Sequence, residues 1–258
     1  MLNGLFLDSI PELVVFILSA LLFLGAMELG YQLGKTMNRK SPAKSAEGEG
    51  TIVAATLALL AFMMAFVVSS ALGIFTERRQ LVIQEANAIG TTYLRSGYLD
   101  EPYRTEARDL LCEYVDLRLA ALDPAKLEMA ITQSEQIHNE LWKSAETIAR
   151  ESPSETIALY ISSLNEVIDL HTERISIGLV IRVPPVVIYA IYIVALFTLF
   201  LAGMQNGYAE NRNLIAQIIL VVVISLVFLL IIDLDRSDQG LLQVPQQALI
   251  DLQRHLNP

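Results

Sequence analysis

Four stretches of the chain are long and apolar enough to cross a lipid bilayer. Their approximate limits are Leu13–Leu33, Thr51–Phe75, Val183–Met204 and Leu214–Ile232. A helix of about 20 predominantly apolar residues spans the hydrocarbon core of a membrane. The stretch Thr51–Phe75 also contains no charged residue. The pattern therefore predicts a multi-pass membrane protein.

The second stretch continues into a polar segment without a helix breaker. Residues 76–95 contain no proline, and apolar positions recur there at helical spacing, at Val82, Ala86, Ile89 and Tyr93. We therefore expect one continuous helix from Thr51 to Arg95, which spans the membrane and then extends beyond it.

The region between the second and third stretches is helical in pattern throughout. New helices are expected at Pro102, at Asp123-Pro124 and at Ser152-Pro153-Ser154-Glu155, and no strand-like alternation appears. The predicted fold is all-α: four transmembrane helices, with an extramembrane antiparallel helical bundle formed by extension of the second and third. The expected parts are 1–75 (two spans and their loop), 76–181 (bundle), 182–233 (two spans) and 234–258 (amphipathic tail).

Charge and composition exclude several functions. The chain has 28 acidic and 18 basic residues, a formal net charge of −10, which does not suit nucleic-acid binding. The single cysteine, Cys112, excludes an internal disulfide. His138 and His255 lack neighbours at metal-ligand spacing, and hydrolase motifs are missing. We expect no metal, no cofactor and no enzymatic activity. His171, on an apolar helix face, is either a pH-sensitive or ligand-binding residue or, more commonly, a buried hydrogen-bonded one.

Basic residues crowd the connection between the first two spans: Lys35, Arg39, Lys40 and Lys44. Short basic loops between spans stay in the cytoplasm. We therefore expect the 35–50 loop to be cytoplasmic, and the N-terminus, the bundle and the C-terminus to lie outside an inner (plasma) membrane.

Small residues form a stripe along one face of the second span: Ala54, Ala58, Ala61, Ala65, Ser69 and Gly73. Such a stripe indicates either close helix packing, which is the commoner cause, or the wall of a narrow conduit. Gly30 and Gly34 also allow close helix approach. Because this is more packing surface than one small protomer needs, we expect a homo-oligomer.

An acidic cluster follows the fourth span and consists of Asp233, Asp235, Arg236 and Asp238. Its spacing does not match an EF-hand, and the final glutamate ligand of such a loop is missing. We expect an interfacial salt-bridge network, with Arg236 or the pair Arg78 and Arg79 as the basic partners.

Several motifs together resemble the bestrophin-like family of prokaryotic four-span proteins. They are Phe75-Thr-Glu77-Arg78-Arg79-Gln-Leu81, Glu85-Ala86-Asn87-Ala88-Ile89-Gly90, Arg182-Val-Pro-Pro185, Asp233-Leu-Asp235-Arg236 and the segment Gly240 to Leu252. The resemblance implies a likeness to bestrophins, which are pentameric anion channels with four spans and a helical body between the second and third. Their pore is lined by the second span, and their helical body is cytosolic, opposite to the orientation expected here.

We therefore expect an oligomeric ion channel, with anion selectivity implied by the resemblance alone. The candidate pore-lining residues are the stripe Ala54, Ala58, Ala61, Ala65, Ser69 and Gly73, together with Leu60 and Phe66. The candidate vestibule residues are Glu77, Arg78, Arg79, Glu85 and Asn87. The expected partners are the lipid bilayer, further copies of the chain and small ions. The alternative is a non-conducting membrane-anchored sensor or scaffold that uses the bundle as a binding surface.

Overall fold

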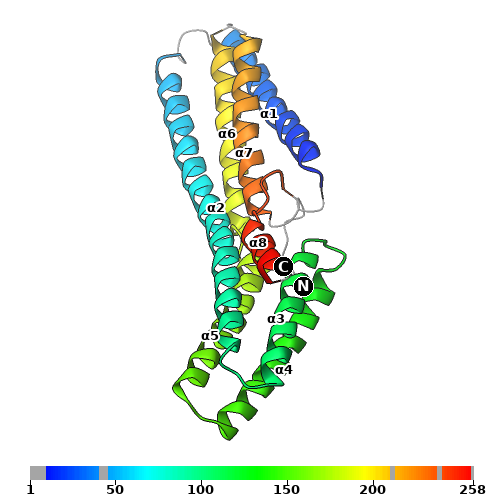
Figure 1. The fold of residues 1–258 in the computed structure, drawn as a ribbon. Helices are drawn as coiled ribbons and strands as arrows, with labels where there is room; N and C mark the ends of the chain where they lie inside the picture. The colour runs from blue at the N-terminus through cyan, green and yellow to red at the C-terminus, as the bar shows by residue number, and fades with distance from the viewer. Residues whose placement is uncertain (1–9, 41–45, 210–212, 237–239, 257–258) are drawn as a thin grey trace. The chain divides into compact units, whose positions relative to one another are not determined.

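The computed structural model describes residues 10–40, 46–209, 213–236 and 240–256. This part of the chain contains helices and no strand, as predicted (Figure 1). The helices are α1 (Glu12–Lys40), α2 (Ala46–Ser96), α3 (Tyr103–Ala120), α4 (Leu127–Glu151), α5 (Glu155–Ile175), the π-helical turn η2 (Ser176–Val180), α6 (Pro185–Tyr208), α7 (Leu214–Asp235) and α8 (Gln247–Leu256).

Within the described residues, four helical segments are long and apolar enough to cross a membrane, and they contain α1, α2, α6 and α7. The chain is thus a multi-pass membrane protein. The prediction of one unbroken helix in the second span is confirmed, because α2 runs over 51 residues. The prediction of a loop over residues 35–50 is wrong at both ends, since α1 continues to Lys40 and carries Lys35 and Arg39, and α2 begins at Ala46. Lys44 lies outside the described residues.

The helix before the third span does not run directly into it. Helical structure ends at Val180 and resumes at Pro185, and Ile181 and Pro184 adopt extended ψ angles of 116° and 128°. Proline lacks an N–H donor and disfavours helical geometry in the preceding residue, so Pro184 and Pro185 break the helix here. The body helices and α6 are therefore joined by a short extended link.

The chain divides into two compact units. Unit 1 consists of the described residues in 1–74, 182–236 and 240–242, and unit 2 of those in 75–181 and 243–258. Unit 1 thus holds α1, the first half of α2, α6 and α7. Unit 2 holds the second half of α2 with α3, α4, α5, η2 and α8.

Unit 1 is organised around a contact between the backbones of α1 and α6. A Cβ atom added to Gly30 would lie 2.0 Å from the carbonyl oxygen of Phe200, and one added to Gly203 would lie 2.0 Å from that of Met27. A Cβ atom added to Gly34 or Gly207 would likewise lie 2.1 or 2.3 Å from a carbonyl oxygen of the opposite helix. Only glycine fits at these positions, because any side chain would force the helices apart.

The close approach predicted from Gly30 and Gly34 is therefore confirmed. The helix that approaches them, however, belongs to the same chain and not to another protomer. The partner is a second motif with the same spacing, Gly203 and Gly207, on α6 of the same chain. These glycines are used within the protomer, so they give no support to an oligomer. Aromatic rings extend the contact to α7: Tyr192 stacks on Phe23 at 5.7 Å and packs on Phe228 at 4.0 Å between ring centroids.

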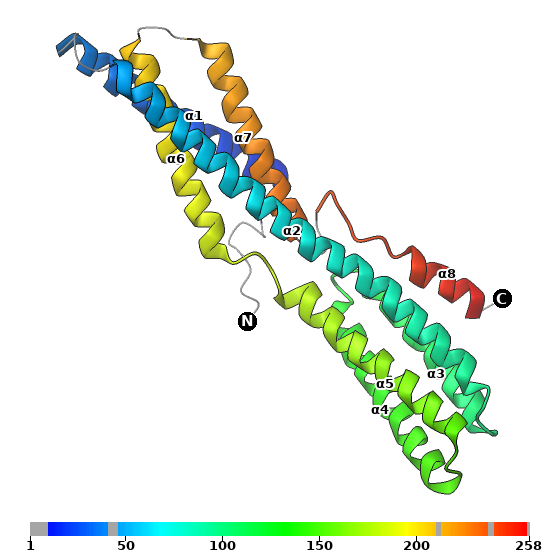
Figure 2. The same ribbon diagram turned by 90° about the vertical axis from the view of Figure 1, so that its left-hand side faces the viewer.

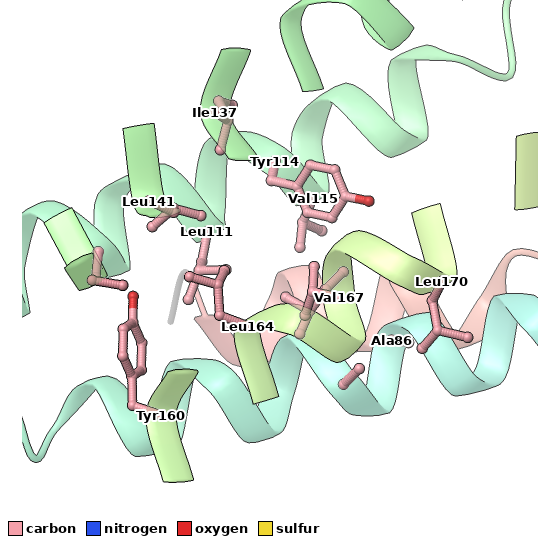
Figure 3. Close-up of a cluster of buried hydrophobic side chains, with 14 of the residues drawn as sticks. Ala86, Leu111, Tyr114, Val115, Ile137, Leu141, Tyr160, Leu164, Val167 and Leu170 are labelled. Carbon is pink, nitrogen blue, oxygen red and sulfur yellow. The ribbon is translucent and has the colours of Figure 1, made fainter. Parts of the chain in front are cut away.

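Unit 2 is a helical body with a closely packed interior. In Figure 2 the helices α3, α4 and α5 lie alongside the second half of α2. Apolar side chains from all four helices point toward one another, among them Ala86, Leu111, Leu141 and Leu164 (Figure 3). The predicted start at Ser154 is confirmed, since its Oγ accepts a hydrogen bond from the backbone N–H of Ile157 at 3.3 Å.

We expect that replacing Gly30 with Val destabilises unit 1, because the branched side chain cannot fit against the Phe200 carbonyl. Overpacking of this kind costs about 1–3 kcal/mol. Gly25→Val is the matched control, since nothing lies within 4 Å of a Cβ added at Gly25. Denaturant titration of the purified proteins in mild detergent measures both. Equal stability of the two variants would contradict the close helix contact.

Candidate functional site

The small-residue face of α2, defined as Ala54, Ala58, Ala61, Ala65, Ser69 and Gly73, is exposed along its whole length. The opposite side of the helix is buried in unit 1 by Val53, Leu60, Met64, Val67 and Ala71. Of the most apolar part of α2, only 22% is buried, against 28–39% of the corresponding part of the other three candidate spans. The protomer therefore leaves its smallest side chains uncovered on its least buried span.

The other two pore candidates separate in the structure. Phe66 is exposed, whereas Leu60 is 2% exposed and packs inside unit 1. Because Leu60 faces away from the small-residue face, it is not available to a conduit along that face. The remaining seven pore candidates are exposed, and their role in a pore stays a prediction.

The vestibule candidates also divide into two groups. Glu77, Arg79 and Asn87 are exposed. Arg78 is 5% exposed and Glu85 is fully buried, so these two side chains belong to the interior of unit 2. Their burial argues against a place in a solvent-filled vestibule. The Nε and Nη2 atoms of Arg78 donate to the carbonyl oxygens of Ile177 and Ile181 at 3.1 and 3.0 Å.

Glu85 is the centre of a polar cluster in the helical body, which we call the Glu85 centre (Glu85, Tyr114, Arg118, His138, His171 and Arg174). Its Oε1 atom accepts a hydrogen bond from the Tyr114 hydroxyl at 2.5 Å and lies 3.0 Å from the Arg118 Nε. Its Oε2 atom accepts from the Nη1 of Arg174. A buried charge is tolerated only when it is paired and hydrogen-bonded, and Glu85 meets both conditions.

Two histidines complete the centre. The Tyr114 hydroxyl lies 3.1 Å from the Nδ1 of His171, and the rings of His138 and His171 meet edge to face at 4.8 Å. A tyrosine has one proton to donate, and here it goes to Glu85. The Nδ1 of His171 must then carry the proton that it donates to the tyrosine oxygen. Of the two interpretations of His171, the structure supports the buried, hydrogen-bonded one.

Burial changes the acid–base behaviour of this cluster. Burial, followed by the negative charge of Glu85, raises the pKa of Tyr114 well above its ordinary value, so the phenol stays protonated. Burial also lowers the pKa of His138 from 6.5 to about 4, with Glu85 opposing and Arg118 adding to the shift. At neutral pH the centre thus contains one carboxylate, two guanidinium groups and a neutral His138.

Two acidic residues in the last turn of α7, Asp233 and Asp235, bind backbone N–H groups of unit 1. Asp233 accepts from the N–H groups of Leu241 and Leu242 at 2.5 and 3.2 Å, and Asp235 accepts from that of Val183 at 2.7 Å. The Nη1 of Arg236 forms an ion pair with the Oε1 of Glu12 at 3.6 Å. Glu12 is a partner that the sequence did not indicate. Asp238 lies outside the described residues.

The Glu85 centre was not predicted from the sequence, although the sequence contains two signals for it. Arg118 follows Tyr114 by four residues on the apolar side of α3, and Arg174 follows Leu170 by four on the apolar side of α5. A charged residue on an apolar helix face requires a buried partner of opposite charge.

Across the described ranges, no group of three His, Cys, Asp or Glu side chains is placed to hold a metal ion.

Comparison with known proteins gives the following matches. The profile of the Bestrophin-like domain matches residues 17–249. A crystal structure of a bacterial bestrophin homologue from Klebsiella pneumoniae is 15% identical, with a TM-score of 0.68, covering 95% of this chain and 97% of that chain. A mutant of a bacterial bestrophin homologue from the same organism is 16% identical, with a TM-score of 0.66 and the same coverage. At such identities the likeness shows the fold. A search of the curated proteins finds no match.

We expect Glu85→Gln to destabilise the protein by about 3–5 kcal/mol, the usual cost of removing one partner of a buried ion pair. Glutamine keeps the shape of the side chain but leaves Arg118 and Arg174 without their counter-charge. Glu77→Gln, on the exposed side of the same helix, is the matched control and should change stability by less than about 0.5 kcal/mol. Chemical unfolding in detergent distinguishes the two, and a small effect in both would argue against the ion pairs.

Stability should also fall on acidification below neutral pH. The unfolded chain binds a proton at His138 near pH 6.5, whereas the folded protein does so only near pH 4. The contribution is therefore complete above pH 6.5 and is lost progressively toward pH 4, to a total of about 3 kcal/mol. Unfolding free energies of wild type and His138→Asn between pH 7 and 5 test this. A slope unchanged in the variant would exclude His138 as its source.

Proposed function

The chain belongs to the bestrophin-like family, and we propose that it assembles with copies of itself into an ion channel whose conduit follows the small-residue face of α2. One observation supports this proposal most directly. The face is exposed in the protomer, and a lipid-facing surface gains nothing from alanine, serine and glycine, which offer little area for packing. Small side chains on an exposed span suit either a close contact between protomers or the wall of a narrow passage.

Exposed residues on this face and next to it provide the two elements that a selective passage needs. Ser69 and Ser70 supply hydroxyl groups, and Phe66 supplies a bulky apolar side chain for a hydrophobic constriction. Leu60 has no part in the proposal because it is buried. Further along α2, Glu77 and Arg79 present charge of both signs at the surface. We propose these two residues as the mouth of the conduit.

Anion selectivity is proposed from the family alone, because bestrophins are anion channels. We keep the expected orientation as part of the proposal, with the helical body outside an inner (plasma) membrane and the loop after α1 in the cytoplasm. The lipid bilayer surrounds the remaining exposed apolar side chains of α1, α6 and α7, such as Leu21, Phe197 and Ile215.

We expect Ala65→Trp to abolish ion flux from liposomes that contain the purified protein, because the indole ring would fill the space along the small-residue face. Ala190→Trp is the matched control: it introduces the same side chain at an exposed position of α6 and should leave flux within about twofold of wild type. Flux is measured for chloride and for sodium, to compare the two signs of charge.

Two results would contradict the conduit. If ion flux persisted in a correctly folded Ala65→Trp variant, the conduit would not lie along the small-residue face. A monomeric wild-type protein in mild detergent, measured by light scattering, would exclude the oligomer. If wild type carried no flux under any salt, the alternative function, a membrane-anchored sensor or scaffold, would be favoured. A cavity in the helical body is the observation that supports that alternative.

A further inference from the structure

A cavity of about 400 Å³ lies within unit 2, and three arginines of that unit line it: Arg78, Arg118 and Arg174. Its volume is within the range of about 300–1,000 Å³ that is usual for small-molecule sites. The rest of the wall is mainly aliphatic, and includes Leu81, Val82, Leu127, Ile131, Ile175 and Leu179. A cavity lined by arginines and aliphatic side chains suits an amphipathic anion.

Arg118 is the arginine of the cavity whose terminal N–H groups are available to a ligand. Its side chain is 6% exposed, and its Nε forms the ion pair with Glu85 at 3.0 Å. Within the described part of the chain Glu85 is its only charged or hydrogen-bonding partner, so its two terminal nitrogens have no protein acceptor while the residue lines the cavity. A guanidinium nitrogen that has no protein acceptor remains able to donate to a ligand. The acceptor that fits this position is a ligand oxygen.

The charge balance around the cavity favours an anion. In the Glu85 centre one carboxylate faces two guanidinium groups, Arg118 and Arg174, which leaves a formal charge of +1 on the three residues. Arg174 also donates from Nη2 to the Oε1 of Gln246 at 3.4 Å, so both of its terminal nitrogens have protein acceptors, whereas those of Arg118 have none within the described part of the chain. A single carboxylate on Arg118 would neutralise the excess charge.

The lining excludes other ligand classes. Among the described residues that line the cavity there is no Asp or Glu to bind an ammonium group and no aromatic ring to stack on a nucleobase. Amino acids, amines and nucleotides therefore lack a partner for part of their structure.

We propose that this cavity binds a small aliphatic carboxylate, with the carboxylate on the terminal nitrogens of Arg118 and the hydrocarbon chain against the leucine and isoleucine wall. The proposal does not depend on ion conduction, because every residue in it lies in the helical body.

Gly178 is a position at which a side chain can be added to the lining of the cavity. It lines the cavity, and nothing lies within 4 Å of a Cβ added to it. Gly178→Leu thus places four carbon atoms in open space. Gly25→Leu on α1 is the matched control, because it makes the same change at an open position outside the cavity.

The experiment is isothermal titration calorimetry of hexanoate into the full-length protein in mild detergent. We expect saturable binding to wild type and to Gly25→Leu, and a loss of about tenfold or more in affinity for Gly178→Leu and for Arg118→Gln, which removes one charge-assisted contact. Hexanol, which has the same chain without charge, should bind at least about tenfold more weakly than hexanoate.

Each contrary result overturns the proposal. Hexanoate binding that is equal in Gly178→Leu and wild type would place the ligand elsewhere. Equal affinity for hexanol would remove the role of Arg118. The absence of saturable heat would exclude the ligand class. If Arg118→Gln fails to fold, Gly178→Leu and hexanol still decide. Binding is measured as heat rather than flux, so its failure leaves the conduit proposal unaffected.

Discussion

The helical body depends on a single buried carboxylate. Glu85 has no exposure to solvent, and it accepts from Tyr114 and Arg174 and pairs with Arg118. These partners come from α3 and α5, while Glu85 itself belongs to α2, the helix that continues from the membrane span. Desolvation of the carboxylate is offset only when all three helices are in register. The ion pairs therefore specify how the body packs, as well as stabilising it.

The apolar pattern was sufficient to predict the fold, and not the interior of the body. Helix type, the four spans and the continuity of α2 follow from hydrophobic length and periodicity, which depend on local sequence. The Glu85 centre joins residues up to 89 positions apart, and no local pattern reveals which charges meet. For this reason Arg78 and Glu85 looked like surface residues next to Glu77 and Arg79, although helix geometry turns them inward.

The small residues show the same limit in a different way. Gly30 and the stripe on α2 give similar signals in the sequence, because both allow a helix to approach closely. The structure assigns them to different surfaces: Gly30 is covered by α6, whereas the small-residue face of α2 is exposed. A spacing rule identifies a surface that permits close contact, but the partner is set by the tertiary arrangement. Exposure in the folded protomer is the observation that distinguishes the two.

The glycine contact between α1 and α6 has a consequence for synthesis. Because α1 is made before α6, its glycine face cannot meet Gly203 and Gly207 until residues 41–184 and then α6 have been synthesised. Throughout this interval the backbone carbonyl of Met27, which Gly203 later meets, faces lipid or a passing helix. The α1–α6 contact can therefore form only after α6 has been synthesised, and any factor that shields the glycine face of α1 must release it then.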